Sequence, residues 1–134
     1  MIPKYRAWHI AENKMYPIMK IDLDDEDVMV DREVYGWPKD RYQILLFSEI
    51  ILMQSTGLHD LAKIEIFDGD IVKSINPNIT VPGVIDYSVS DGEWNIIYKF
   101  DAEDIFIDPL GHFHLCINVV GNIHANPELL KGNP

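Results

Sequence analysis

Three side chains that can bind a transition metal alternate near the end of the sequence: His112, His114 and Cys116. We expect them on a strand, where alternating side chains share one face. Imidazole nitrogen and thiolate sulfur are ligands that zinc and related metals accept. A fourth ligand is not evident, although His124 or a partner chain could supply one. A metal centre is therefore one hypothesis, and ordinary packing of these residues is the favoured interpretation.

Four acidic residues have the spacing of the first, third, fifth and twelfth positions of a calcium loop: Asp22, Asp24, Glu26 and Glu33. Side-chain oxygens at such positions surround a hard cation. The position that needs glycine for the sharp turn is Asp27, and no helix is evident on either side. We therefore favour an acidic loop that is simply solvated.

A carboxylate set for magnesium-dependent phosphodiester hydrolysis can be drawn from the second half of the chain, namely Asp68, Asp70, Asp86, Asp101, Glu103 and Asp104. With 22 acidic residues in the chain, however, neighbouring carboxylates are expected by chance. No serine or cysteine nucleophile occupies a recognisable turn. The sequence thus predicts no catalytic residue and no cofactor.

The charge and composition of the chain narrow the possible partners. The 22 acidic and 11 basic residues give a net charge of -11, which repels phosphate backbones, so nucleic acid is not the expected partner. Cys116 is the only cysteine, which rules out an internal disulfide and fits a reducing cytoplasm. No apolar run is long enough to span a membrane, and the N-terminus does not resemble a signal peptide. We expect a cytoplasmic protein with no membrane partner.

Short apolar stretches between turn residues predict strands along most of the chain. They are rich in β-branched and aromatic residues, which fit the half-buried surface of a sheet. We expect strands over residues 5–8, 15–23, 28–30, from 71, 84–89, 93–100 and 113–123. Residues 42–54 are long enough for a helix, but their composition favours two short strands or a helical turn leading into a strand.

Asp91 and Gly92 predict the tight turn of a hairpin between residues 84–89 and 93–100, because the pair readily supplies a positive φ. Four apolar side chains alternate along its second arm and should face the core: Trp94, Ile96, Tyr98 and Phe100. Asn126 and Pro127 predict the start of one short helical turn.

These elements predict a mostly β protein, built as a small antiparallel barrel or sandwich. All 134 residues fit one domain. Within it we expect an N-terminal β subdomain over residues 1–63, an SH3-like barrel over 64–125 and a short C-terminal helical turn over 126–131.

Four stretches in this order resemble the YopX family of small phage and prophage proteins: residues 4–8 with 13–16, then 52–58, then 65–72, then 120–130. The resemblance implies a mostly β fold with an SH3-like part and a place in the bacterial cytoplasm. Because the function of the family is unknown, it implies no catalytic residue. The sequence departs from the family pattern at Lys63, where members have glycine, and this puts the local turn in doubt.

Polar residues inside the family-like stretches suggest a second candidate site. Arg6, Gln54, Thr56 and Asp70 could converge between the two halves and hold a ligand. We favour a structural interpretation, in which Gln54 and Thr56 bind turn backbone and glycines supply positive φ values.

The leading hypothesis is a phage accessory protein that is not an enzyme and works by protein contacts, either with copies of itself as a homo-oligomer or with a host or phage factor. The alternatives are a metal-dependent enzyme or small-ligand binder, and a nucleic-acid binder or acidic mimic of DNA.

Overall fold

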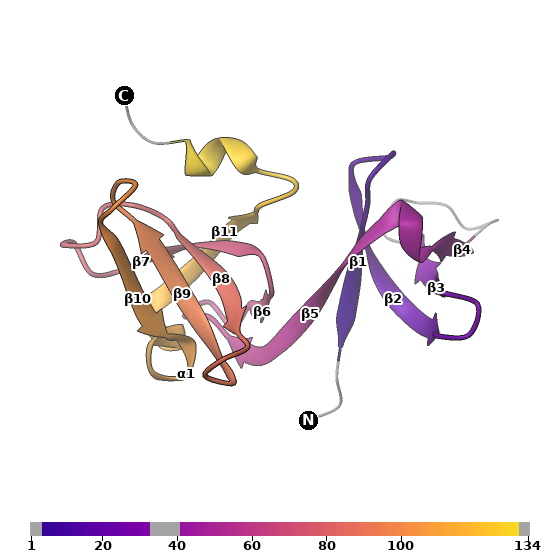
Figure 1. Cartoon of the computed structure of the whole chain (residues 1–134), viewed down its shortest axis with the longest axis horizontal. Helices are drawn as coiled ribbons and strands as arrows, with labels where there is room; N and C mark the ends of the chain where they lie inside the picture. Colours follow the sequence, from indigo (N-terminus) through magenta and orange to yellow (C-terminus); the bar gives the residue numbers. More distant parts are fainter. Residues whose placement is uncertain (1–3, 33–40, 132–134) are drawn as a thin grey trace. The chain divides into compact units, whose positions relative to one another are not determined.

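The computed structural model describes residues 4–32 and 41–131 and shows a mostly β protein. Its described strands form two antiparallel sheets, one of six strands and one of five, as the sequence predicts (Figure 1). Two compact units share the chain, unit 1 over Met1–Gln54 and unit 2 over Ser55–Pro134. Among the described residues, no helix has the length and apolar character that crossing a membrane takes.

Unit 1 is an antiparallel sheet in which neighbouring strands follow the order β4-β3-β2-β1-β5. Its elements are β1 (Tyr5–His9), β2 (Lys14–Asp22), β3 (Asp27–Asp31), β4 (Tyr42–Leu46), the 3-10 turn η2 (Phe47–Glu49) and β5 (Ile50–His59). Side chains from one face of these strands form its core: Ala7, Tyr16, Val28, Val30, Leu45 and Ile50. Alternating burial along β3, with Val28 and Val30 inward, is the period of two expected for a half-buried strand.

The ambiguous segment 42–54 forms two strands separated by a helical turn, so the interpretation favoured from its composition is confirmed. Leu45 points into the core while Ile44 on the same strand is exposed. A helix would have buried residues at a spacing of three to four, which this pattern does not show. Tertiary pairing of β4 with β3 therefore sets the structure of the segment.

Unit 2 contains the second sheet, with strands in the order β10-β9-β8-β7-β11. Its strands are β6 (Glu65–Phe67), β7 (Asp70–Ser74), β8 (Gly83–Ser88), β9 (Glu93–Lys99), β10 (Ile105–Pro109) and β11 (Ile117–Asn122). The second half of β5 belongs to this unit and pairs with β6. The core of unit 2 is formed by Ile66, Val72, Ile85, Ile96, Tyr98, Leu110 and Ile117. Closure into an SH3-like barrel stays a prediction.

The β8–β9 hairpin confirms the turn predicted at Asp91 and Gly92, where Gly92 has a φ of 68°. Ile96 and Tyr98 face the core as expected, and Trp94 packs against it. The prediction for Phe100 was wrong, because its side chain is exposed. Phe100 follows the end of β9, where its N–H bonds to the carbonyl of Asp104, so the alternation of the strand no longer applies.

The strand predicted over residues 113–123 is wrong in its first part. A helical turn α1 (Leu110–Phe113) and a 3-10 turn η3 (His114–Cys116) precede β11, and the edge strand β10 before them was not predicted. Leu110 and Ile117 are both buried in the core of unit 2, and the helical turns connect them. Packing thus overrides the local preference of this segment for extended structure.

The predicted C-terminal helical turn is present as η4 (Pro127–Leu130), with proline in its first turn. Asn126 stands before it, but its side chain does not cap the helix. Its Oδ1 instead accepts a hydrogen bond of 3.2 Å from the N–H of Asn122. This contact folds the chain back after β11 and requires glycine at 121, because a Cβ there would lie 2.5 Å from the same oxygen.

The turn in doubt at Lys63 is formed, and a buried carboxylate holds it. Asp60 Oδ1 accepts hydrogen bonds from the N–H groups of Ala62 at 2.9 Å and Ile64 at 2.8 Å. Lys63 adopts a φ of 67°, the left-handed region that glycine enters without a steric cost. The hydrogen bonds to Asp60 therefore stabilise a turn that its own residue 63 disfavours.

Replacing Lys63 by glycine should stabilise the protein. Relief of the left-handed strain exceeds the extra chain entropy of glycine, so we expect Lys63→Gly to raise the free energy of unfolding of unit 2 by about 0.5–1 kcal/mol. Chemical denaturation measures this change. The matched Lys63→Ala variant keeps the Cβ and should stay within about 0.5 kcal/mol of the parent. Equal stability of the glycine and alanine variants would show that the turn carries no strain.

Candidate functional site

The three metal-ligand candidates do not lie on a strand. His112 belongs to α1, and His114 and Cys116 belong to η3, so the alternation that placed them on one face does not exist. His114 Nδ1 lies 2.7 Å from the carbonyl oxygen of His59. Within residues 4–32 and 41–131, no three histidine, cysteine or acidic side chains are grouped so that they could hold a metal ion. The metal hypothesis therefore loses its geometric basis.

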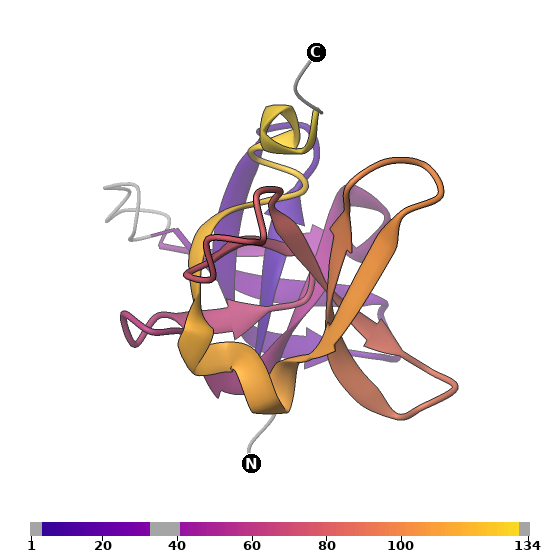
Figure 2. The same cartoon turned by 90° about the vertical axis from the view of Figure 1, so that its left-hand side faces the viewer.

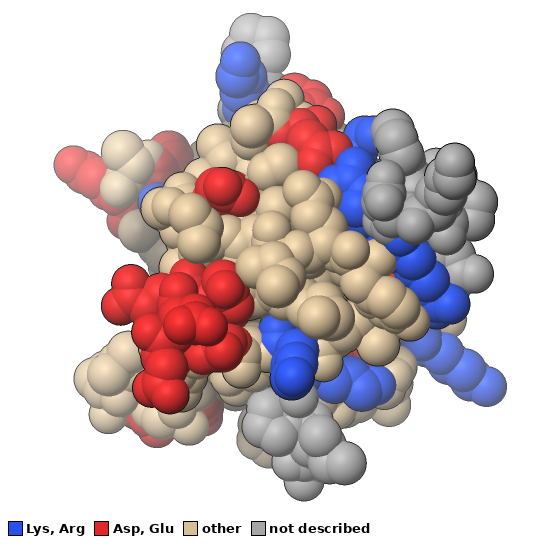
Figure 3. Space-filling model, turned by 90° about the vertical axis from the view of Figure 1, so that its right-hand side faces the viewer, with Lys and Arg blue, Asp and Glu red and all other residues tan. Residues whose placement is uncertain are grey.

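The acidic segment after β2 is an exposed turn whose carboxylates bind their own backbone. Asp22 Oδ1 accepts hydrogen bonds of 3.0 Å from the N–H groups of Asp24 and Asp25, and these bonds lower the pKa of Asp22. Repulsion from Asp22 and Asp27 raises the pKa of Asp25. Glu33, the last position of the calcium pattern, lies outside the described residues. On the face that Figure 3 draws, acidic side chains form one dense group, and others lie apart from it.

Of the four polar candidates in the family-like stretches, Thr56 and Asp70 make hydrogen bonds to nearby backbone. Arg6 lies opposite Met53 in the pairing of β1 with β5, and Gln54 at the end of the same ladder is exposed. Thr56 Oγ1 donates to the carbonyl oxygen of Ile66 at 2.8 Å, which joins β5 to β6.

Asp70, the fourth of these candidates, is buried at the start of β7. Its Oδ2 accepts a hydrogen bond of 2.8 Å from the N–H of Phe67. This bond closes the turn at Gly69, where φ is 80°. The contacts of Thr56 and Asp70 are those of the structural interpretation, and ligand binding by the set of four stays a hypothesis.

The carboxylates proposed for magnesium are dispersed. Asp101 Oδ1 accepts 2.8 Å hydrogen bonds from the N–H groups of Glu103 and Asp104, which shapes the loop between β9 and β10. Asp68 and Asp86 influence one another, since burial and then repulsion from Asp86 raise the pKa of Asp68. These contacts do not form a catalytic centre.

The two ends of the sheet in unit 2 differ in what covers their backbone. At the β11 end, Leu61 N–H donates to the carbonyl of Ile117 at 3.0 Å, and Val119 N–H donates to Asp60 Oδ2 at 2.8 Å. The backbone N–H and carbonyl groups of residues 117 and 119 point away from β7, because these groups point the same way at alternate residues of an antiparallel strand. The turn held by Asp60 therefore occupies this edge.

At the other end, β10 pairs with β9 and with no further strand among the described residues (Figure 2). Phe106 stacks on Tyr98 with ring centroids 6.1 Å apart, so its ring packs against the sheet. Ile105 and Ile107 on the opposite face are 46% and 54% exposed. An uncovered edge that carries exposed apolar side chains is a place where another chain can pair. We call strand Ile105–Pro109 with this free side the β10 edge.

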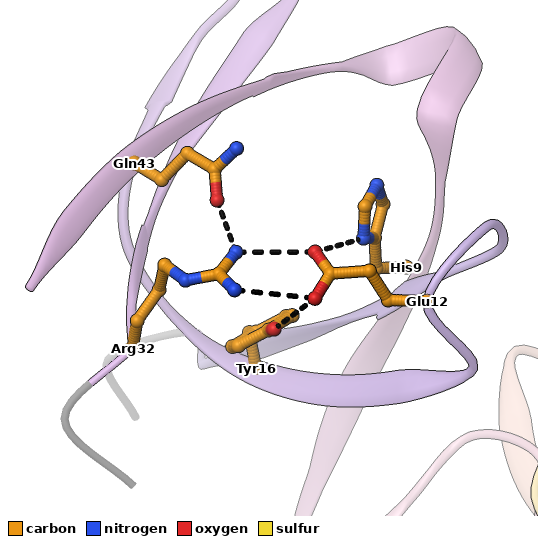
Figure 4. A network of polar contacts seen from close by, with 5 residues as sticks. All are labelled: His9, Glu12, Tyr16, Arg32 and Gln43. Atoms are coloured by element: carbon orange, nitrogen blue, oxygen red, sulfur yellow. Dashed lines mark hydrogen bonds and ion pairs between the residues drawn. The ribbon is translucent and has the colours of Figure 1, made fainter. Parts of the chain in front are cut away.

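A charged cluster in unit 1, which the sequence did not reveal, surrounds Glu12 (Figure 4). The Arg32 guanidinium binds both carboxylate oxygens at 3.1 Å, and the Tyr16 hydroxyl donates to Oε2 at 2.9 Å. His9 Nδ1 lies 2.7 Å from Oε1. Gln43 on β4 also accepts a hydrogen bond from Arg32. The cluster therefore joins the β1–β2 turn to β3 and β4.

Electrostatics hold this carboxylate ionised. The hydrogen bond from Arg32, aided by the Tyr16 hydroxyl, lowers the pKa of Glu12 from 4.5 to about 2. The Arg32 guanidinium also stands 5.1 Å from the centre of the Tyr16 ring. A cavity of about 510 Å³ opens beside His9 and Gln43. Because both oxygens of Glu12 are occupied and its basicity is low, the cluster is better suited to fastening strands than to proton transfer.

Only tertiary pairing brings the cluster together. Arg32 and Gln43 are separated in sequence by the segment 33–40 and meet through the β3–β4 ladder. The one local signal is the spacing of three between His9 and Glu12, which is common by chance. No pattern of residue types marks this cluster in advance.

Removing the charge of Glu12 should destabilise unit 1 in a pH-dependent way. We expect Glu12→Gln to lower the free energy of unfolding at pH 7 by about 2 kcal/mol, because Arg32 is left buried without its carboxylate. The pKa of Glu12 is lowered by folding, so its contribution is complete above pH 4.5 and is lost as pH falls toward about 2.

Urea titrations at several pH values measure this difference. The difference in free energy of unfolding between the parent and Glu12→Gln should disappear over that acid range. Glu49→Gln is the same change at an exposed acid of unit 1, and it should leave the free energy of unfolding equal to that of the parent. A gap that stays constant from pH 7 to acid would contradict the assigned role of Glu12.

Comparisons with known proteins agree on one family. The family model described as YopX protein matches residues 4–131. A crystal structure of protein EF1440 from Enterococcus faecalis superposes with a TM-score of 0.65 at 27% identity, covering 98% of this chain and 99% of that one. Protein yopX from Bacillus subtilis superposes with a TM-score of 0.56 at 21% identity, covering 96% and 98%, which supports the fold. No match was found among curated proteins. The chain belongs to the YopX protein family.

Proposed function

We propose that this protein is not an enzyme and acts by binding an extended segment of another protein at the β10 edge. The observation that carries the proposal is the contrast between the two ends of one sheet. The β11 end is covered by the Asp60 turn, whereas at the β10 end no described strand follows. Strand addition at such an edge supplies backbone hydrogen bonds for affinity and side-chain contacts for specificity.

The negative charge near the β10 edge favours a partner segment with basic side chains. The loop before β10 carries Asp101, Glu103 and Asp104, all exposed, and Lys99 precedes it at the end of β9. The whole chain has a net charge of -11. A segment that alternates apolar residues with lysine or arginine would match both the exposed isoleucines and this acidic loop. A second copy of the chain would bring the same net negative charge to the β10 edge and would be repelled by it.

We place this interaction in the cytoplasm of a bacterium that carries a phage or prophage, where the partner is a host or phage protein. The resemblance of the sequence to phage and prophage proteins supports this setting. So does the bacterial source of both solved relatives.

Placing a positive charge on the β10 edge should abolish partner binding. We expect Ile107→Lys bait to lose any protein that the parent chain captures from a lysate of the bacterial host, because the lysine repels a basic segment and removes an apolar contact. Quantitative mass spectrometry of the captured proteins measures this loss. Ile75→Lys is the matched control, since Ile75 is 56% exposed in the same unit but lies outside the edge. Capture that both lysine variants retain equally would exclude the β10 edge.

Self-association, the second form of the hypothesis, should depend on salt. Repulsion between two chains of net charge -11 is screened as ionic strength rises, so we expect a monomer at low salt and any dimer only at high salt. Light scattering across a salt series measures the mass. A stable dimer at low salt would show that a second copy is the natural partner.

A further inference from the structure

A cavity of about 830 Å³ lies in unit 2, and its lining includes Ile85 of the core. Its volume falls in the range of sites that hold small organic molecules. Val84 of β8 and Ile97 of β9, which are directly paired, form its apolar floor. Both side chains are only partly buried, so they are available to a ligand.

Backbone hydrogen bonds fix the walls of this cavity. Gly69 N–H donates to the carbonyl of Ile85, and Ile123 N–H donates to the carbonyl of Gly69, both at 2.9 Å. These bonds lock the turn before β7 to β8 and to the end of β11. Leu130 at the end of η4 also lines the cavity, and the Asn122–Asn126 contact directs the chain between β11 and η4. The cavity is thus bounded by fastened backbone segments.

The charged side chains that line the cavity differ in their exposure to solvent. Asp68 and Asp86 lie close enough for their carboxylates to repel one another. Asp68 is half-buried, whereas Asp86, Lys99 and Lys131 are exposed. Exposed lysines can turn their ammonium groups into water on long flexible stems, but Asp68 cannot leave the cavity. The fixed, poorly solvated charge is therefore negative, and a cation would relieve the repulsion between the two carboxylates.

We propose that this cavity binds a small organic cation, with its ammonium group between Asp68 and Asp86 and its apolar body on Val84 and Ile97. The geometry of a floor, two fastened walls and a carboxylate pair at one side defines the site. It is independent of the β10 edge, and neither proposal requires the other.

Three indole probes of the same shape test the charge preference: tryptamine, the neutral tryptophol and the anionic indoleacetate. Titration of the full chain, followed by amide chemical shifts, gives each dissociation constant and its location. We expect tryptamine to bind about tenfold more tightly than tryptophol, since its ammonium adds charge-assisted hydrogen bonds. The shifts should concentrate at residues 68–69, 84–86 and 97. Equal affinities, preference for indoleacetate, absence of tryptamine binding or shifts elsewhere would overturn the proposal.

Neutral isosteres locate the ammonium group. Asp68→Asn and Asp86→Asn should each weaken tryptamine about tenfold while leaving tryptophol unchanged, because only the charge is removed. Glu103→Gln, an exposed acid outside the cavity, is the matched control and should change neither affinity. Tryptamine affinity that survives both asparagine substitutions would overturn the assignment, and the parent titration tests the site even if a variant does not fold.

Discussion

Backbone hydrogen bonding at the two ends of the unit 2 sheet is the constraint on which this account depends. A strand at the end of a sheet exposes N–H and carbonyl groups that need a partner, which can be water, the chain itself or another chain. At β11 the chain itself supplies hydrogen-bond partners, namely the N–H of Leu61 and the buried carboxylate of Asp60. At β10 no further described strand pairs, and the exposed side chains of the strand are apolar. One sheet is thus closed at one end and available at the other.

Several carboxylates of this protein hold the chain in place. Asp22, Asp60, Asp70 and Asp101 each accept hydrogen bonds from N–H groups of nearby turns, and Glu12 fastens Arg32. These contacts account for the positions of the five side chains without a metal or a substrate. Acid spacing in the sequence does not by itself separate carboxylates that hold a turn from carboxylates that would hold a cation. Asp68 and Asp86 differ, because a cavity lies beside them.

Much of the fold follows from the sequence, because strand composition and turn residues act locally. The hairpin around Gly92 and the strands of unit 1 were predictable for this reason. The edge strand β10 and the helical turns after it were not, since they form where Leu110 enters the core. The division of the chain into two compact units falls inside β5, between Gln54 and Ser55, and no turn residue marks that position in the sequence.

The candidate site was less predictable than the fold. The metal hypothesis depended on a strand at His112–Cys116 that the structure replaces by helical turns. The β10 edge depends on which strand is outermost, and the cavity on how η4 folds back through Asn126. Both are properties of pairing and packing between distant segments, which residue types alone do not encode.

Amide hydrogen exchange at single-residue resolution tests the central claim most directly. A short peptide that alternates lysine with valine serves as the probe strand, and the same peptide with glutamate in place of lysine serves as its control. The account predicts that the basic peptide slows exchange within Ile105–Pro109 and leaves β11 unchanged, while the acidic peptide slows neither. Unchanged exchange at β10 with the basic peptide, or equal slowing by both peptides, would contradict it.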